Sequence, residues 1–304
     1  MKMNQVGKSD ITVSALTLGC MSLGTDRKKA ESIIDRSLDM GVNHLDTADL
    51  YIFGLNEEIV GEAIKPKRGD IILTTKVGNH FNKEKKDWFW DPSEKHIKNG
   101  IKDSLKRLQT DYIDLYLLHG GTIEDNIDES IHAFEDLKKE GLIRAYGISS
   151  IRPNVIREYV RKSNIDAVMM QYSLLDRRPE EELLDLLHAN SISVLARGPL
   201  AKGMLSNESQ TIIENKGKNG FLNYSYQELK EVNEQIKNIK ADSFNELSLK
   251  YVLKHPGLAT AVFGASSIEQ AEENLKGDFK KPLDNKIYVQ LQQITKPNKY
   301  DQHR

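Results

Sequence analysis

Short apolar segments alternate along this chain with segments whose apolar residues recur at helical spacing, and the alternation repeats eight times between Ala15 and Leu275. Such alternation requires a parallel sheet whose strands are joined by helical crossovers. Eight units within roughly 250 residues are typical of the (β/α)8 barrel. A doubly wound open sheet is the alternative, but no early strand is followed by the G-x-G-x-x-G turn of that fold. We therefore predict an α/β protein built as a (β/α)8 TIM barrel.

The same pattern places the individual elements. Strands are predicted over 16–20, 42–46, 71–76, 112–119, 143–149, 167–172, 192–196 and 259–264. Helices are predicted over 27–40, 56–64, 94–108 with Ser93 as its N-cap, 127–140, 153–162, 179–189, 226–239, 245–254 and 268–275. An N-terminal β-hairpin over 3–16 and a C-terminal helical extension over 284–294 flank the barrel, while 78–91 is expected to be a long loop and 197–224 an insertion. Because no linker rich in proline, glycine or serine interrupts the pattern, residues 1–304 are predicted to form a single domain.

Charge and cysteine usage narrow the function classes. The formal net charge is −2, which gives no electrostatic reason to expect a nucleic-acid partner or an anionic membrane surface. One cysteine, Cys20, excludes an intramolecular disulfide and suits a reducing cytosol. The N-terminus lacks the apolar core of a signal peptide, and no apolar run approaches the ~20 residues of a membrane span. We expect a cytoplasmic protein with no membrane association and no obligatory protein partner.

Polar residues at the carboxyl ends of the predicted strands are the first candidates for a functional site, because active sites of such barrels form there. They are Asp46, Lys76, His119, Ser149 and Gln171. The second, third and fourth strands are neighbours in a barrel, so the first three of these side chains are expected to converge. A buried aspartate and a buried lysine each stabilise the charge of the other.

Tyr51 follows the strand that ends at Asp46 and adds a group that can release a proton. An ammonium beside a phenol stabilises the phenolate relative to the phenol, which suits a general acid that protonates a developing alkoxide. Taken singly, an Asp–Lys pair, a loop tyrosine and a strand-end histidine are each more often structural. Their combination at one mouth, with no comparable set at the other end of the strands, favours a catalytic site.

Other chemistries have weaker support. No zinc-ligand spacing and no G-x-S-x-G elbow occurs, so we expect no metal site. The loop at 198–203 is not a phosphate loop of the Walker type, because Met204 stands where a lysine is required. Cys20 is a candidate nucleophile by position, although its apolar setting favours core packing. Lys76 could alternatively act as a Schiff-base amine of a lyase or isomerase. The polar surroundings of Trp88 and Trp90 favour a lid or a pocket wall, with core packing as the alternative.

Six motifs together resemble the aldo-keto reductases, in particular bacterial relatives of the potassium-channel β-subunit group. They are DTADLY (46–51), LTTKVG (73–78), YIDLYLLHGG (112–121), AYGISS (145–150), MQYSLLDR (170–177) and GASSIEQAEENL (264–275). The resemblance implies an oxidoreductase that reduces small aldehydes and ketones to alcohols with NADPH, or oxidises alcohols with NADP+, with NAD less favoured as the cofactor. It implies that Tyr51 donates the proton, that Lys76 and Asp46 adjust the acidity of this tyrosine, and that His119 orients the carbonyl.

The resemblance also implies a cofactor site along the strand ends. Its members are Cys20, Met21, Asp46, Ser149, Ser150, Gln171, Arg197, Gly198, Pro199, Leu200, Ala201, Gly203, Gly264, Ser266, Gln270, Glu273 and Asn274. Trp88 and Trp90 are assigned to the substrate pocket. Arg197 replaces the aromatic residue that often stacks on the nicotinamide, and Gly264 and Gln270 are uncharged where some members carry basic residues. Gly120 and Gly121 follow His119 in place of a bulkier pair, which predicts a wider pocket. The alternative function is a nucleotide-sensing subunit of reductase shape with little turnover.

Overall fold

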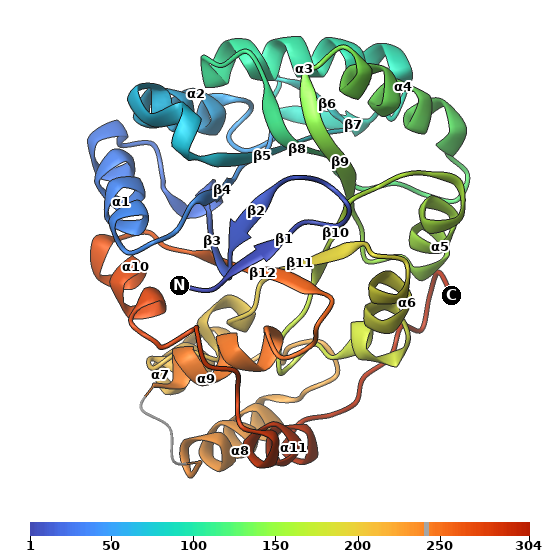
Figure 1. Ribbon diagram of the computed structural model, residues 1–304. Helices are drawn as coiled ribbons and strands as arrows, with labels where there is room; N and C mark the ends of the chain where they lie inside the picture. Colours follow the sequence, from blue (N-terminus) through green and yellow to red (C-terminus); the bar gives the residue numbers. More distant parts are fainter. Residues whose placement is uncertain (240–242) are drawn as a thin grey trace.

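The computed structural model describes residues 1–239 and 243–304, and its centre is a closed barrel of parallel strands surrounded by helices (Figure 1). Around the barrel the strands follow the order β10-β11-β12-β3-β4-β5-β8-β9. They are β3 (Leu16–Gly19), β4 (His44–Asp46), β5 (Ile72–Val77), β8 (Ile113–Leu118), β9 (Ile143–Ser149), β10 (Ala167–Gln171), β11 (Ser193–Arg197) and β12 (Leu258–Gly264). The predicted (β/α)8 barrel is confirmed, and each predicted strand is observed with its ends shifted by two residues at most.

The strands are buried on both faces, because their inner side chains fill the barrel and their outer side chains meet the helices. In β8 all six residues are buried. Leu115 and Leu117 join Ala145 and Met169 in the interior, whereas Tyr116 and Leu118 belong to the larger core between barrel and helices. The alternation of the pleat therefore divides each strand between two apolar cores.

The helices follow the predicted spacing in most places. They are α1 (Arg27–Asp39), α2 (Leu55–Ile64), α3 (Glu94–Leu108), α4 (Ile127–Lys139), α5 (Pro153–Lys162), α6 (Leu183–Ala189), α7 (Ser209–Lys216), α8 (Tyr226–Lys237), α9 (Phe244–Val252), α10 (Ile268–Leu275) and α11 (Asn285–Ile294). Ser93 caps α3 as predicted, since its hydroxyl accepts a hydrogen bond from the His96 backbone N–H at 3.2 Å.

An N-terminal hairpin closes the amino end of the barrel. Its strands β1 (Met3–Gln5) and β2 (Thr12–Ser14) pair antiparallel, and the hairpin lies in front of the barrel strands in Figure 1. Val6, Ile11 and Val13 are fully buried among the interior side chains of the barrel. Because the hairpin fills the amino end of the barrel, a ligand can enter only at the mouth formed by the carboxyl ends of the strands.

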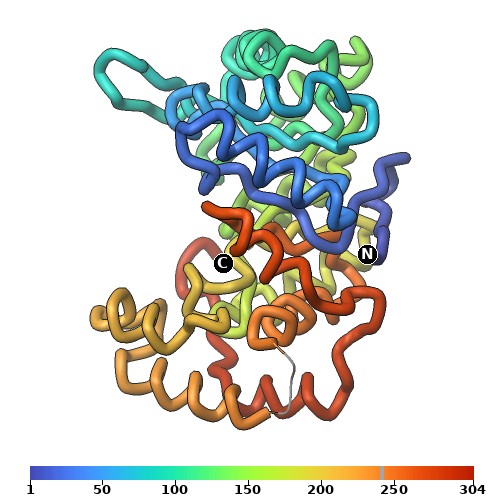
Figure 2. The backbone as a smooth tube through the Cα atoms, turned by 90° about the vertical axis from the view of Figure 1, so that its left-hand side faces the viewer, coloured from blue at the N-terminus to red at the C-terminus, as the bar shows by residue number. Residues whose placement is uncertain are grey.

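Three segments differ from the prediction. The expected loop over 78–91 contains an antiparallel hairpin, β6 (Asn79–Asn82) and β7 (Asp87–Trp90), which projects from the molecule on the side away from the N-terminal hairpin (Figure 2). The predicted helix over 179–189 is divided into the 3-10 turn η3 (Arg178–Glu181) and α6, because Glu182 between them has an extended φ of −158°. The insertion after β11 holds the short turn η4 (Ala201–Gly203) and the helix α7, which periodicity did not reveal.

The predicted C-terminal helix is observed as α11, and the chain then returns to the barrel. Helix α11 packs beside α8 (Figure 1), and Arg177 donates hydrogen bonds to the backbone oxygens of Gln292 and Thr295. Near the end of the chain, the His303 carbonyl accepts from the Asn154 backbone N–H on α5 at 2.8 Å. Within the described ranges, no helix combines the length and the apolar character that crossing a membrane would require.

Candidate active site

Lys76 is the centre of a polar cluster at the carboxyl end of β5. Its ammonium lies 2.8 Å and 2.9 Å from the two carboxylate oxygens of Asp46 on the neighbouring strand β4. It also donates to the Thr47 carbonyl at 2.6 Å and lies 3.4 Å from the Tyr51 hydroxyl. Lys76 is fully buried and Asp46 almost so, while Tyr51 is half-buried. The predicted approach of Asp46 and Lys76 is observed.

Opposing effects of burial and pairing set the charges of this cluster. Burial alone would lower the pKa of Lys76, but the Asp46 carboxylate and the Tyr51 oxygen outweigh it and hold that pKa above its ordinary value. Burial raises the pKa of Asp46, and the Lys76 ammonium partly offsets this. The lysine is therefore a cation whose charge faces the phenol of Tyr51.

His119 follows β8 and faces the same mouth. Its ring lies edge-on to the Tyr51 ring, with 5.9 Å between centroids and 80° between planes. Burial, together with the charges of Lys76 and Arg197, lowers the pKa of His119 to about 3. A neutral imidazole at this place can offer an N–H to a substrate oxygen without carrying a charge of its own.

The loop that carries Tyr51 has an unusual backbone. Ile52 and Phe53 have φ values of +50° and +51°, and Gly54 follows with +88°. Left-handed φ is unfavourable for a β-branched residue and persists only where surrounding contacts hold it. Gly54 is required here, since a Cβ on it would come within 2.8 Å of the Arg107 side chain.

A buried ion pair that the sequence did not indicate fixes this loop from behind. Glu57, in the first turn of α2, is fully buried. It accepts from Arg107 Nε of α3 at 2.6 Å and from the Thr75 hydroxyl of β5 at 2.5 Å. Because Thr75 precedes Lys76, the pair links the Tyr51 loop to the strand that presents the lysine.

A hydrogen-bonded chain inside the barrel lies beneath the cluster and was also missed. Thr17 bonds Thr260 and His44 Nδ1, and His44 Nε2 bonds Thr74, each at 2.7 Å. All four residues are fully buried and come from β12, β3, β4 and β5 in turn. Burial and the Lys76 charge lower the pKa of His44 to about 3. The residue types carry no sequence signal, because a strand threonine or histidine predicts nothing about its partner.

The Trp90 indole packs over the two glycines that the sequence places beside the mouth, Gly78 and Gly120. A Cβ on Gly120 would lie 3.1 Å from the Trp90 indole, and one on Gly78 only 2.6 Å from it. The indole therefore occupies the space that the glycines leave, and its N–H bonds Asp125 Oδ2 at 3.0 Å. Trp88 lies farther out on the same strand and is 55% exposed. The structure places Trp90 against the backbone of Gly120, next to His119, and Trp88 on the projecting hairpin.

The residues assigned to a cofactor follow the rim across neighbouring strands β9, β10, β11, β12 and β3. Ser149, Gln171 and Arg197 end the first three of these, and the loop after Arg197 forms a compact turn. Its Gly198, Ala201, Lys202 and Gly203 have positive φ, with Pro199 buried and Leu200 half-buried between them. Ser150, buried beyond β9, accepts from the Arg152 backbone N–H at 3.2 Å.

The far end of this rim lies where β12 leads into α10. Gly264 ends the strand, and Ser266 donates backbone and hydroxyl hydrogen bonds to Gln270, each at 2.9 Å. Glu273 accepts from Asn207 at 2.6 Å, and Asn274 accepts from Asn245 at 2.7 Å.

Beside this end of the rim, Met21 is 63% exposed, whereas Cys20 is fully buried. Burial raises the pKa of the Cys20 thiol far above its ordinary range. This excludes an activated thiolate nucleophile in this setting and favours core packing for Cys20.

Acidification is expected to destabilise the fold through His119. The unfolded chain binds a proton on this imidazole near its ordinary pKa of 6.5, whereas the folded chain does so only near 3. Stability from the neutral ring is therefore present above pH 6.5 and is lost as the pH falls toward 3. Between pH 7 and 5 this loss is about 2 kcal/mol in the free energy of unfolding.

Urea unfolding at the two pH values measures this effect. The difference in unfolding free energy between pH 7 and 5 should shrink by about 2 kcal/mol in His119→Gln relative to the parent. His132→Ala, which changes a histidine with a 65% exposed side chain, is the control and should leave that difference unchanged. Equal pH dependence in His119→Gln and the parent would contradict a neutral buried His119.

Comparison with known proteins finds the family that the sequence motifs resemble. A sequence profile for the Aldo/keto reductase family matches residues 15–296. The uncharacterized oxidoreductase YqkF of Bacillus subtilis is 53% identical, with 100% of both chains covered. The NADH-specific methylglyoxal reductase of Escherichia coli is 32% identical over 90% of this chain and 93% of its own.

A solved aldo-keto reductase of Bacillus halodurans, in its holo form, superposes with a TM-score of 0.95 at 53% identity, covering 100% of this chain and 99% of that one. A probable potassium channel β subunit of Arabidopsis thaliana also matches, at 28% identity over the full length of both. The match supports the predicted relation to the potassium-channel β-subunit group.

Proposed function

The chain belongs to the aldo/keto reductase family, and from this premise we propose that it reduces small aldehydes and ketones to alcohols with NADPH, using Tyr51 as the proton donor. The observation that carries the proposal is the buried Lys76 ammonium, held by Asp46 and 3.4 Å from the Tyr51 hydroxyl at the open end of the barrel. A phenol at that place can protonate an oxygen bound in the mouth. We also propose that residues 1–304 act as one domain and work in the cytosol, where the single Cys20 stays reduced.

An unpartnered polar atom in the mouth supports a bound ligand. In the part of the chain that the structure describes, His119 Nδ1 is buried without a hydrogen bond. A buried polar atom without a partner costs about 1–3 kcal/mol, so a ligand that supplies one is favoured. A carbonyl oxygen would lie beside His119, and a ribose hydroxyl could bond the Asp46 carboxylate.

The loop of positive φ after Arg197 supports a phosphate-bearing cofactor. Backbone turns of this kind form concavities whose N–H groups can bind anions. Gly198, Ala201 and Gly203 would cover the pyrophosphate, while Ser149 and Gln171 would hold the carboxamide. Arg197 is exposed at the end of β11, where its planar guanidinium could stack on a nicotinamide ring.

In this proposal the residues of the chain orient groups and move one proton. A bound nicotinamide supplies the hydride, and that chemistry belongs to the cofactor. The neutral His119 ring donates an N–H to the carbonyl oxygen and fixes its position. Tyr51 gives its phenolic proton to the same oxygen as negative charge develops there, and Lys76 stabilises the phenolate that remains. Trp90 and its partner Asp125 hold one wall of the mouth and limit the size of the substrate.

Cofactor preference is the first test. We expect kcat/KM with NADPH to exceed that with NADH by about tenfold, the worth of one hydrogen bond to a charged phosphate. Ser266 and Gln270 would contact that phosphate from the N-terminal turn of α10. Measuring the oxidation of both reduced cofactors, with a panel of small aldehydes and ketones, checks the expectation.

NADH is the second candidate because α10 is acidic. Glu269, Glu272 and Glu273 lie on this helix, and carboxylates disfavour a 2′-phosphate while accepting a ribose hydroxyl. An equal or higher kcat/KM with NADH would overturn the NADPH preference and leave the reductase assignment standing. Tight binding of either nucleotide without turnover of any carbonyl would overturn the reductase assignment and favour the nucleotide-sensing subunit. Trapping of a substrate adduct by borohydride would instead support a Schiff base on Lys76.

A further inference from the structure

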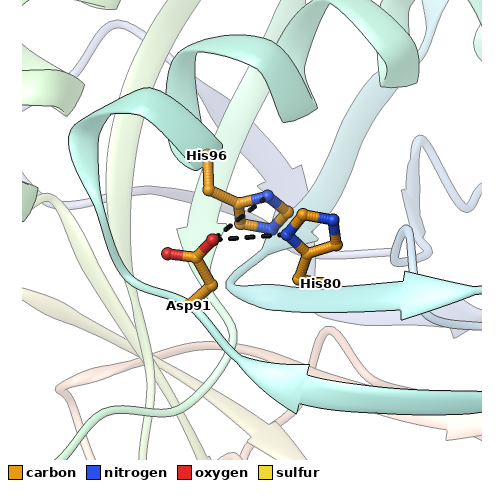
Figure 3. A group of neighbouring side chains, drawn as sticks. All are labelled: His80, Asp91 and His96. Carbon is orange, nitrogen blue, oxygen red and sulfur yellow. Dashed lines mark hydrogen bonds and ion pairs between the residues drawn. The ribbon is translucent and has the colours of Figure 1, made fainter.

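Two histidines and an aspartate meet at the base of the β6–β7 hairpin, outside the catalytic cluster (Figure 3). His80 comes from β6, Asp91 directly follows β7, and His96 lies in the first turn of α3. One donor atom from each residue lies within 4.8 Å of the other two. His80 Nδ1 is 3.3 Å and His96 Nδ1 4.0 Å from Asp91 Oδ2. The Nδ1 atoms of His80 and His96 both face the Asp91 carboxylate, and the three side chains come from three separate elements (Figure 3).

These distances suit a transition-metal ion. Ligand atoms about 2.0–2.2 Å from a tetrahedral zinc ion are roughly 3.3–3.6 Å from one another. The observed separations of 3.3 Å and 4.0 Å approach this range, and the two imidazoles, stacked with centroids 4.8 Å apart, must rotate for both to direct a nitrogen at one ion. Two imidazoles and one carboxylate form a donor set that binds zinc and its first-row neighbours while leaving positions open for water.

Asp91 leaves one carboxylate oxygen for a cation. Its Oδ1 accepts a hydrogen bond from the Ser93 backbone N–H at 3.2 Å, whereas its Oδ2 is the oxygen that faces the two imidazoles. The other ring nitrogen of His96, Nε2, is buried without a partner among the described residues.

A second group with ligand-type residues lacks this property. Glu94, His132 and Asp136 also lie close together. The Lys98 ammonium, however, is 2.6 Å from carboxylate oxygens of both Glu94 and Asp136. A cation already neutralises that group. By contrast, within residues 1–239 and 243–304 the ion pairs of Asp91 involve His80 and His96 alone.

We propose that His80, Asp91 and His96 form a binding site for a divalent first-row transition-metal ion of the zinc type. The site would join the hairpin to α3 at the place where the chain leaves β7. It lies next to Trp90, whose indole fills the space above Gly78 and Gly120. A metal bound here fixes the hairpin base and with it the Trp90 wall of the mouth, without contacting the reacting atoms. The proposal departs from the expectation of no metal site, because these three residues match no known ligand spacing in the sequence.

The two tryptophans of the chain, Trp88 and Trp90, both lie on β7 and provide a readout that is independent of turnover. Untagged, chelator-treated protein is titrated with Zn²⁺ by calorimetry, and with Cu²⁺ or Ni²⁺ while tryptophan fluorescence is recorded. We expect one equivalent of Zn²⁺ to bind, Cu²⁺ or Ni²⁺ to quench the fluorescence with the same stoichiometry, and Mg²⁺, which prefers oxygen ligands, to do neither.

Variants locate the site. His80→Ala and Asp91→Asn should each weaken Zn²⁺ binding by more than the roughly 10–100-fold loss typical of groups that only support a ligand. His80 has a 52% exposed side chain, so its removal leaves the fold intact, and an unchanged circular dichroism spectrum verifies this. His132→Ala is the matched control and should keep the affinity of the parent. Absence of Zn²⁺ binding to the parent, or equal affinity in His80→Ala and His132→Ala, would overturn the proposal.

Discussion

Replacing Tyr51 by phenylalanine is expected to lower the turnover of carbonyl substrates about 10²–10⁴-fold, the range that a positioned general acid contributes. The ring remains, so its edge-on contact with His119 and the packing of the loop persist. Only the hydroxyl 3.4 Å from the Lys76 ammonium is removed. Steady-state consumption of the reduced nucleotide gives kcat and KM, and fluorescence titration gives the nucleotide affinity. We expect kcat to fall while that affinity stays within about twofold of the parent.

Tyr226→Phe is the matched control, because it removes a phenol that also has a lysine nearby, with Lys230 Nζ 5.7 Å from the ring centroid on α8. This variant should turn over at the rate of the parent. If Tyr51→Phe reduces the carbonyl panel as fast as the parent, Tyr51 is not the proton donor. A loss of nucleotide binding in Tyr51→Phe would instead show that the loop, rather than the proton, had been disturbed.

Lys76→Met is expected to lower both the turnover of carbonyl substrates and the stability of the fold. The substitution keeps an unbranched chain in the barrel but leaves the buried Asp46 carboxylate without its cation. Removal of one partner of a buried ion pair typically costs 3–5 kcal/mol, and we expect a loss of about that size in the free energy of unfolding. Turnover should fall by about 10² or more, since the phenolate of Tyr51 loses its stabilising charge. Urea unfolding and steady-state kinetics measure the two effects separately.

A double-mutant cycle separates pairing from packing in this result. Asp46→Asn placed together with Lys76→Met removes the unpaired charge, so the double variant should regain part of the lost stability but none of the turnover. Lys98→Met provides the comparison at a partly exposed pair, where the loss of stability should be much smaller because solvent screens the charges. If Lys76→Met and Lys98→Met lose the same free energy of unfolding, Lys76 and Asp46 do not form a tightly coupled buried pair.

The sequence determined the fold class and the strand-end members of the polar cluster around Lys76, through the spacing of apolar residues and the direction of the strands. Apolar residues alternate between short runs and helical spacing, and only a closed parallel sheet with outer helices buries both faces of strands such as β8. The carboxyl ends of parallel strands all lie at one rim of a barrel. Asp46, Lys76 and His119 lie at the ends of neighbouring strands, so the barrel prediction also predicts that they lie close together. Tyr51 lies on a loop and gives no periodic signal, so it was predicted from its place just beyond Asp46 in the chain and from the family motifs.

The tertiary structure decided which side chains touch across elements. Trp90 over Gly120, Glu57 with Arg107, and the meeting of His80, Asp91 and His96 each join residues from separate elements. Such contacts depend on loop conformation, strand register and rotamer choice, none of which leaves a regular spacing in the chain. For the same reason the hairpin over 79–90 was predicted as a loop: its strands are largely exposed and lack the apolar alternation that burial imposes. The spacing of apolar residues along the chain predicts which residues are buried. Only the tertiary structure shows which groups each polar side chain contacts.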